Sequence, residues 1–111
     1  MKRGELWTAA TGSGFGSKPL PVLVVQGDAY AEAPNIIVAL LTTVLEDGQG
    51  VRPKIEPDGG NGLEQTSLVQ VDLLVAAPKR KFGRRIGHLS LQDQAHVDRA
   101  VLIYLGFGGS E

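Results

Sequence analysis

The chain has 111 residues, a formal net charge of −1 and no cysteine. This length predicts a single domain, residues 1–111, and the lack of cysteine excludes disulfides and thiolate metal sites. With only two histidines and no apolar run long enough to cross a membrane, we expect no metal, no cofactor and no membrane partner, and we expect a cytoplasmic protein.

The first part of the chain predicts two strands joined by a loop. Residues 3–8 alternate as a strand, residues 9–19 are rich in glycine and serine, and residues 21–26 predict a second strand. Gly12 and Gly14 match the start of a dinucleotide-binding fingerprint, but Ser17 stands at the third glycine position. Phosphate loops of this kind precede a helix, whereas here a strand follows, so this loop is predicted to join two strands.

The middle of the chain predicts more strands. Residues 36–44 are apolar on both faces and predict a central strand, although a buried helix has the same pattern. Residues 51–57 predict a short edge strand, because Pro53 cannot donate a ladder hydrogen bond. Residues 63–77 predict a long strand that ends at Pro78, and residues 85–90 predict a last short strand.

The spacing of apolar residues changes near the C-terminus from that of a strand to that of a helix. A helix face is predicted from four apolar residues at helical spacing, Val97, Val101, Tyr104 and Leu105. Ser90 is a predicted N-cap with Asp93 as its partner, and Gly106 is predicted to end the helix. Strands first and one helix last predict a mainly β fold, a small and strongly bent antiparallel barrel with a packed helix.

Positive charge is concentrated in one segment. Five of the eleven basic residues are Lys79, Arg80, Lys81, Arg84 and Arg85, so the rest of the chain carries six basic and twelve acidic residues. Such a run can hold a polyanion even on a near-neutral domain, and a solvated loop gives the same pattern.

The long strand also predicts a polar groove. By the two-residue period, one face carries Thr66, Leu68, Gln70 and Asp72. The other face, predicted to be core, carries Val69, Val71 and Leu73. Neighbours on one face are about 7 Å apart, so Gln70 and Asp72 are predicted to line one shallow groove. A solvent-facing carboxylate on a barrel exterior is the alternative.

Five segments, taken in order, carry a family resemblance. They read RGELW, PVLVVQGDAY, IIVALLTT, GLEQTSLVQVDLL and IGHLS…VDRAVLIYLGF. This ordered set resembles the MazF/PemK (Kid) family of toxin endoribonucleases over residues 3–107. The resemblance implies an SH3-like antiparallel barrel with a C-terminal helix, as in CcdB, PemK and MazF, usually as a homodimer. It also implies a type II toxin that cleaves single-stranded RNA without metal, uses the 2′-hydroxyl as nucleophile and is neutralised by a cognate antitoxin.

The resemblance assigns site residues as well. Thr42 matches the family's functional threonine, and Asp72 matches the acidic position proposed as general base. The family's arginine before the second strand is Leu20 here, so the cation must come from elsewhere. Lys18 is the predicted catalytic cation, with Arg52 and the basic run as other candidates. The predicted substrate-binding residues are Arg52, Gln70, the five residues of the basic run and Phe15, which would stack on a base.

Two other functions remain open on the same barrel. A gyrase-directed toxin of the CcdB type needs no nuclease site, but the ending Trp-Gly-Ile of that branch is absent. A non-catalytic RNA- or protein-binding barrel is favoured by Leu20 in place of the arginine. In the ribonuclease interpretation, the flap of residues 9–19 closes over RNA or is displaced by an antitoxin segment.

Overall fold

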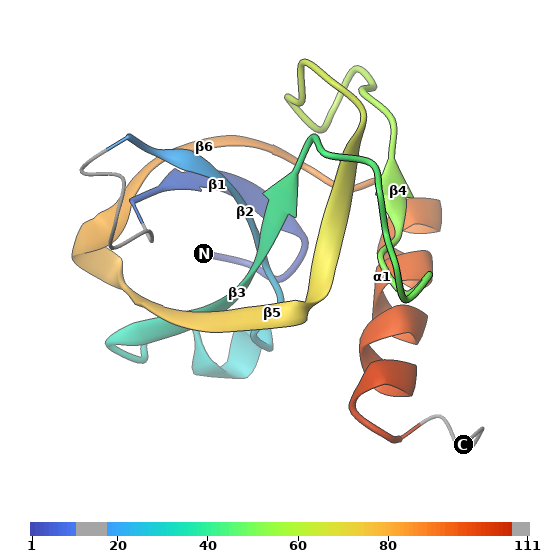
Figure 1. Ribbon diagram of the computed structural model, residues 1–111. Helices are drawn as coiled ribbons and strands as arrows, with labels where there is room; N and C mark the ends of the chain where they lie inside the picture. The colour runs from blue at the N-terminus through green and yellow to red at the C-terminus, as the bar shows by residue number, and fades with distance from the viewer. Residues whose placement is uncertain (11–17, 108–111) are drawn as a thin grey trace.

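The computed structural model describes residues 1–10 and 18–107. Six strands form one antiparallel sheet in the order β4-β5-β3-β2-β1-β6. They are β1 (Glu5–Ala9), β2 (Leu20–Val24), β3 (Asn35–Thr42), β4 (Lys54–Ile55), β5 (Ser67–Pro78) and β6 (Phe82–His88). Figure 1 shows the sheet curled into an open half-barrel, with helix α1 (Leu91–Tyr104) outside it beside β4 and β5. The predicted mainly β fold with a C-terminal helix is confirmed.

The predicted central strand is β3, which pairs with β2 on one side and β5 on the other. Its buried face changes along the strand: Ile36 and Val38 join one apolar cluster, whereas Ala39 and Leu41, on the other face, join a second cluster. Val97 of α1 packs in the second of these clusters. The change of buried face explains why the sequence shows no simple alternation here, and the buried-helix alternative is wrong.

Strand β5 is interrupted by a bulge. Leu40 lies opposite Gln70 whereas Ala39 lies opposite Leu74, so residues 71–73 have no partners on β3. Extra residues of this kind bend a strand and increase its twist, and Figure 1 shows β5 turning sharply along its length. Asp72 is the middle residue of the bulge.

The predicted faces of this strand are wrong at two residues. Strict alternation places Leu73 in the core and Leu68 on a polar outer face. In the structure Leu73 is 44% exposed and Leu68 only 3%. At Leu73 the two-residue period fails because the chain leaves the regular ladder at residues 71–73. Leu68 precedes the bulge, where β5 is paired with both β3 and β4.

Other strand boundaries follow the sequence more closely. The predicted short edge strand is β4, but it spans only Lys54–Ile55, so Pro53 lies just before it rather than inside it. β1 begins at Glu5 rather than residue 3, after Gly4 with φ +92°. β6 spans Phe82–His88 rather than residues 85–90, so Arg84 also belongs to this strand.

The helix is capped as the sequence predicts. Ser90 Oγ accepts a hydrogen bond from the Asp93 N–H at 3.1 Å, and Gly106 follows the helix with φ +89°. Of the predicted buried face, Val97 is 1% exposed, but Tyr104 is 41% exposed. Leu105, which follows the helix, is also exposed. That part of the prediction is wrong because the last turns of α1 project beyond the sheet (Figure 1).

One glycine in the turn before β5 makes a direct test of this fold. Gly62 has φ +72°, and an added Cβ would overlap the carbonyl group of Ile86. We expect Gly62→Ala to lower the free energy of unfolding by about 2–4 kcal/mol, because backbone strain and the overlap add. Gly48→Ala, where a Cβ meets open space, should change it by less than about 0.5 kcal/mol. If chemical denaturation gives Gly62→Ala and Gly48→Ala the same free energy of unfolding, the conformation described for the turn at Gly62 is contradicted.

Candidate functional site

Two of the predicted site residues form an ion pair. Arg52 Nε donates to Asp72 Oδ1 and Arg52 Nη2 donates to Asp72 Oδ2, both at 2.9 Å. The two side chains are 20% and 14% exposed. This bidentate fork is the strong geometry for a guanidinium and a carboxylate. The alternative of a solvent-facing carboxylate at position 72 is therefore wrong.

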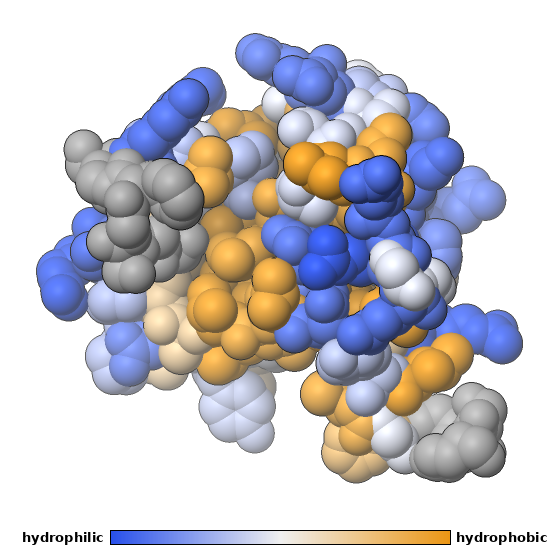
Figure 2. Space-filling view, viewed as in Figure 1, coloured by the Kyte–Doolittle hydropathy of each residue, from blue (hydrophilic) through white to orange (hydrophobic). Residues whose placement is uncertain are grey.

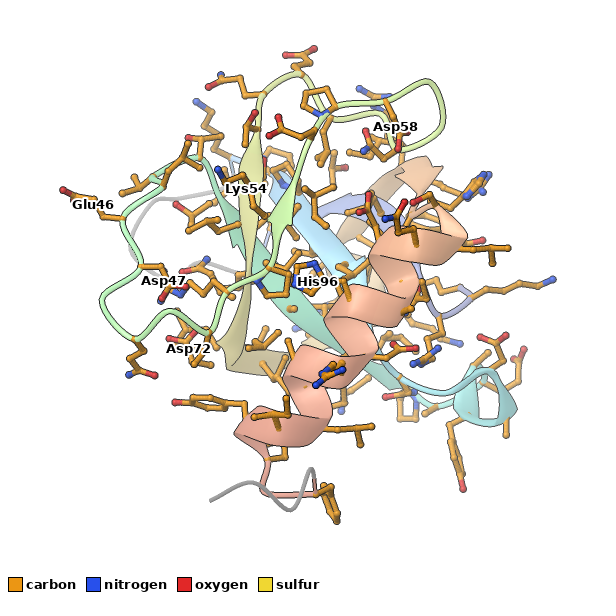
Figure 3. All side chains as sticks on the ribbon, turned by 90° about the vertical axis from the view of Figure 1, so that its right-hand side faces the viewer. Glu46, Asp47, Lys54, Asp58, Asp72 and His96 are labelled. Atoms are coloured by element: carbon orange, nitrogen blue, oxygen red, sulfur yellow. The ribbon has the colours of Figure 1, made fainter. Side chains whose placement is uncertain are left out.

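Separate segments hold the two partners in place. The bulge of β5 positions Asp72, whereas Arg52 precedes the edge strand β4. The Arg52 N–H donates to Asp47 Oδ2 at 2.6 Å, and the Pro53 carbonyl accepts from the Val69 N–H at 2.9 Å. Figure 3 shows Asp47 and Asp72 on the same side of the molecule. Hydrogen bonds to a loop carboxylate and to β5 thus fix the backbone at the arginine.

The pair sets the acid–base chemistry of Asp72. Hydrogen bonds from the Arg52 guanidinium, with its positive charge, hold the pKa of the Asp72 carboxyl below its usual value, while partial burial opposes this shift. The carboxylate is therefore ionised at neutral pH and able to accept a proton. Its strength as a base is reduced as long as Arg52 remains on it.

This lowered pKa gives a testable prediction. We expect Arg52→Gln to raise the pKa of the Asp72 carboxyl, because the hydrogen bonds and positive charge that lower it are removed, and a carbon-detected NMR titration measures this change. In the wild type, the pair stabilises the fold above the ordinary carboxyl pKa, and this stabilisation is lost as pH falls through the lowered pKa. Lys2→Gln removes an exposed charge elsewhere and should leave the titration of Asp72 unchanged. An unchanged titration in Arg52→Gln would contradict the pair.

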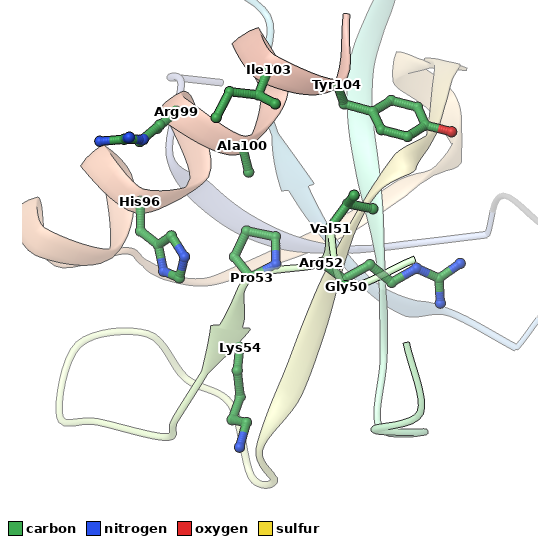
Figure 4. A pocket seen from close by; sticks show the side chains of 10 residues that line it. All are labelled: Gly50, Val51, Arg52, Pro53, Lys54, His96, Arg99, Ala100, Ile103 and Tyr104. Atoms are coloured by element: carbon green, nitrogen blue, oxygen red, sulfur yellow. The ribbon is translucent and has the colours of Figure 1, made fainter. Parts of the chain in front are cut away.

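A groove of about 610 Å³ lies between residues 50–54 and helix α1. Figure 4 shows Pro53 and Ala100 facing each other across its middle. Lys54 and Arg99 line the groove too, and Arg52 joins it to the ion pair. None of its lining residues is an aspartate or glutamate.

Sequence reasoning missed the helix side of this groove. His96, Arg99, Ala100 and Ile103 recur at i, i+3, i+4 and i+7, which places them on one helix face. That spacing is visible in the sequence, beside the stripe that contains Val97. The sequence does not reveal that residues 50–54 lie opposite this face, because the contact joins segments more than forty residues apart.

Thr42 and Gln70 lie on neighbouring strands. Thr42 ends β3 opposite Leu68, and Gln70 lies opposite Leu40, so the two residues occupy the same face of the β3–β5 ladder. The Thr42 hydroxyl accepts a hydrogen bond from the Val44 N–H at 3.1 Å. Gln70 therefore lies in the part of β5 that precedes the bulge, and Thr42 lies beside it at the end of β3.

The position of the family arginine is also defined. Leu20 is the first residue of β2 and is 46% exposed. The β2–β3 register, continued two residues past its last pair, puts Leu20 opposite Thr42. Lys18 lies in the exposed segment just before β2. Phe15 and the glycines of the predicted flap fall outside the described residues.

The basic run lies away from the ion pair. Lys79–Lys81 form a 3₁₀ turn, η2, and Arg84 and Arg85 lie in the edge strand β6. From Asp72 to the end of β5 there are about 20 Å of strand at the usual rise per residue. Arg85 Nε pairs with Glu5 Oε2 at 3.3 Å. The structure therefore brings Arg52 to Asp72, while the basic run forms a separate surface.

The rest of the surface adds three observations. Figure 2 shows apolar surface beside hydrophilic surface on the face seen in Figure 1, and Leu20 and Leu73 are among the exposed apolar side chains. Within residues 1–10 and 18–107, no three histidine, aspartate or glutamate residues gather in a way that could hold a metal ion. In the same ranges, no helix is long and apolar enough to cross a membrane.

Comparisons with known proteins agree on one family. The sequence model of the PemK-like, MazF-like toxins of type II toxin–antitoxin systems matches residues 2–105. The chain is 34% identical to a probable endoribonuclease MazF of Mycolicibacterium smegmatis, over 98% of this chain and 100% of that protein. A mycobacterial endoribonuclease solved in complex with its cognate antitoxin has a TM-score of 0.75 at 19% identity, covering 96% and 93% of the two chains. The Mycobacterium tuberculosis toxin MazF-mt6 has a TM-score of 0.75 at 24% identity, covering 91% and 95%.

Proposed function

Because this chain belongs to the PemK-like, MazF-like toxin family of type II toxin–antitoxin systems, we propose that it cleaves single-stranded RNA without a metal ion, at the Arg52–Asp72 pair. The curated relatives that it matches carry the name endoribonuclease. The observation that carries the proposal is the bidentate pair, which joins a strong phosphate-binding group to an ionised carboxylate. These two groups suit the attack of a 2′-hydroxyl on a phosphodiester.

In this mechanism each partner has one role. Asp72 takes the proton of the 2′-hydroxyl, whose oxygen then bonds to phosphorus. Arg52 stabilises the negative charge of the phosphorane, a role that Leu20 cannot perform. The bond from phosphorus to the 5′ oxygen breaks, and this oxygen takes a proton from water. Thr42 and Lys18 orient the phosphate from the neighbouring end of the sheet.

The pair must rearrange for this chemistry to proceed. While Arg52 holds Asp72, the carboxylate has a lowered pKa and is a weak base. A phosphate of the RNA is a second ligand for the same guanidinium, with the same bidentate geometry. Transfer of Arg52 from the carboxylate to the phosphate frees Asp72 and raises its pKa at the moment when a base is required.

The basic run supplies a second contact with the RNA backbone. Neutralising Lys79, Arg80 and Lys81 together should flatten the dependence of log affinity on log salt by about 0.7 for each lost phosphate contact. The measurement is RNA binding at several salt concentrations. An unchanged slope would place the RNA backbone elsewhere, along Lys18 and the groove beside α1.

The proposal includes two protein partners. A cognate antitoxin is expected from the family, and a mycobacterial endoribonuclease of the same fold has been solved with its own antitoxin. A homodimer is supported by exposed apolar side chains such as Leu20 and Leu73. The site of action is the cytoplasm, where the RNA substrate is made.

One experiment tests the proposed activity. The purified chain is incubated with a long RNA in EDTA, and the new ends are mapped and characterised. We expect cleavage at a short sequence, with 5′-hydroxyl ends and cyclic phosphate or 3′-phosphate ends. Cleavage that vanishes in EDTA and returns with magnesium contradicts the mechanism. RNA that is bound but never cut would instead identify the non-catalytic barrel. In a separate assay, inhibition of DNA supercoiling by gyrase would identify the gyrase-directed toxin.

A further inference from the structure

We propose that the groove between residues 50–54 and α1 binds one nucleotide of the RNA beside the cleaved bond, and so helps to select the cleavage sequence. The proposal rests on the proposed ribonuclease function and assigns it a specificity site. Arg52 is the link, because it pairs with Asp72 and also lines the groove. A strand whose phosphate lies on Arg52 continues directly into this groove.

The size and lining of the groove fit a nucleotide. Its volume of about 610 Å³ lies within the usual range for small-ligand sites. The middle is apolar, with Pro53 on one wall and Ala100 and Ile103 on the other (Figure 4). The ring of Tyr104 lies at the end near Arg52 and offers a surface on which a base can stack.

The charges of the groove fit the sugar–phosphate backbone. Arg52, Lys54 and Arg99 are cationic. Arg52 is paired with Asp72, and the lining residues that the structure describes include no carboxylate beside Lys54 and Arg99. In Figure 4 Arg99 projects from the helix, Lys54 extends from the opposite wall away from the helix, and Arg52 extends toward the right of the view. A phosphate on each side of one base would therefore meet a positive charge.

An acidic peptide would satisfy the same charges. Two observations favour the nucleotide: the groove shares Arg52 with the proposed cleavage site, and its apolar lining residues lie beside an aromatic ring, that of Tyr104. His96 adds a ring whose nitrogens can donate to or accept from a base edge. The peptide is kept as an outcome of the test.

The first test measures binding without cleavage. The probe is a mixed-sequence eight-nucleotide RNA with every 2′-hydroxyl methylated, which removes the nucleophile. Addition of the probe should shift the amide NMR signals of Ala100 and Ile103. Tyr104→Ala should weaken binding about fivefold or more by removing a stacking surface, and Arg99→Gln should weaken it and reduce its salt dependence. Lys2→Gln, an equal loss of exposed charge at a residue that does not line the groove, should bind as the wild type does.

The second test maps cleavage sites in a long RNA for the same variants. We expect Arg99→Gln and Tyr104→Ala to cut with altered or relaxed sequence preference and a raised KM, because the groove positions the RNA without reacting. Wild-type preference and wild-type binding in both variants would overturn the groove proposal and leave the ribonuclease proposal standing. If the wild type cuts no RNA, the proposed function fails. The groove proposal then stands only if the methylated probe binds there, and it falls if a glutamate-rich peptide binds instead.

Discussion

Replacing Arg52 with glutamine should lower the rate of RNA cleavage by about 100- to 1,000-fold, the usual effect of removing one preorganised donor from a developing charge. Its guanidinium is held beside the proposed base by two hydrogen bonds of 2.9 Å to Asp72, from which it transfers to the phosphate. Leu20 stands where the family has an arginine, which leaves Arg52 as the proposed source of the bidentate contact. Single-turnover cleavage of one defined RNA in EDTA measures the effect.

Two variants control this result. Arg52→Lys keeps the charge and loses the planar fork, so its rate should fall between those of the wild type and Arg52→Gln. Lys2→Gln changes the net charge equally and should cleave normally. If Arg52→Gln cleaves at the wild-type rate while Lys18→Gln is inactive, the catalytic cation is Lys18 and the assignment of Arg52 is wrong.

Asp72→Asn should lower the rate by about 100- to 10,000-fold, because it keeps the shape of the side chain and removes the proton acceptor. The affinity of Asp72→Asn for RNA should equal or exceed that of the wild type, since a negative charge near the phosphate is lost. The wild-type rate should increase with pH through the pKa of the freed carboxylate in the RNA complex, and this part of the profile should disappear in the variant.

The expected loss of cleavage in Asp72→Asn must be distinguished from a loss of folding. Asp72→Asn leaves the partly buried Arg52 without its ionic partner, so thermal unfolding is followed for each variant. Glu64→Gln, which alters an exposed carboxylate before β5, should keep both stability and rate. If Asp72→Asn cleaves normally and Thr42→Ala is inactive, the general base is not Asp72 in the bulge and must be sought at the end of β3.

Local patterns were enough to predict the regular elements. The apolar run of β3 reflects two clusters that cover different parts of the strand, and the Ser90–Asp93 cap depends on residues only three positions apart. The short β4 follows from Pro53, which cannot donate to a ladder. These features depend on residues close together in the chain, so the sequence contains the information that specifies them.

The geometry of the site was not predictable in the same way. Asp72 faces Arg52 only because residues 71–73 bulge out of the ladder, and alternation carries no signal for an interruption. The two residues are twenty positions apart, and each was singled out separately by charge and by family resemblance. The helix wall of the groove was missed for the same reason, because it becomes a site only when α1 packs beside β4.

The central claim, that Arg52 and Asp72 form one catalytic unit, is tested most directly by a double-mutant cycle. The rate of metal-free RNA cleavage is measured for the wild type, Arg52→Gln, Asp72→Asn and the double variant. Groups that act as a unit give strongly non-additive losses. We therefore predict that the double variant is within about tenfold of the slower single variant. A loss in the double variant equal to the product of the two single losses, or single variants that cleave at the wild-type rate, would contradict the claim.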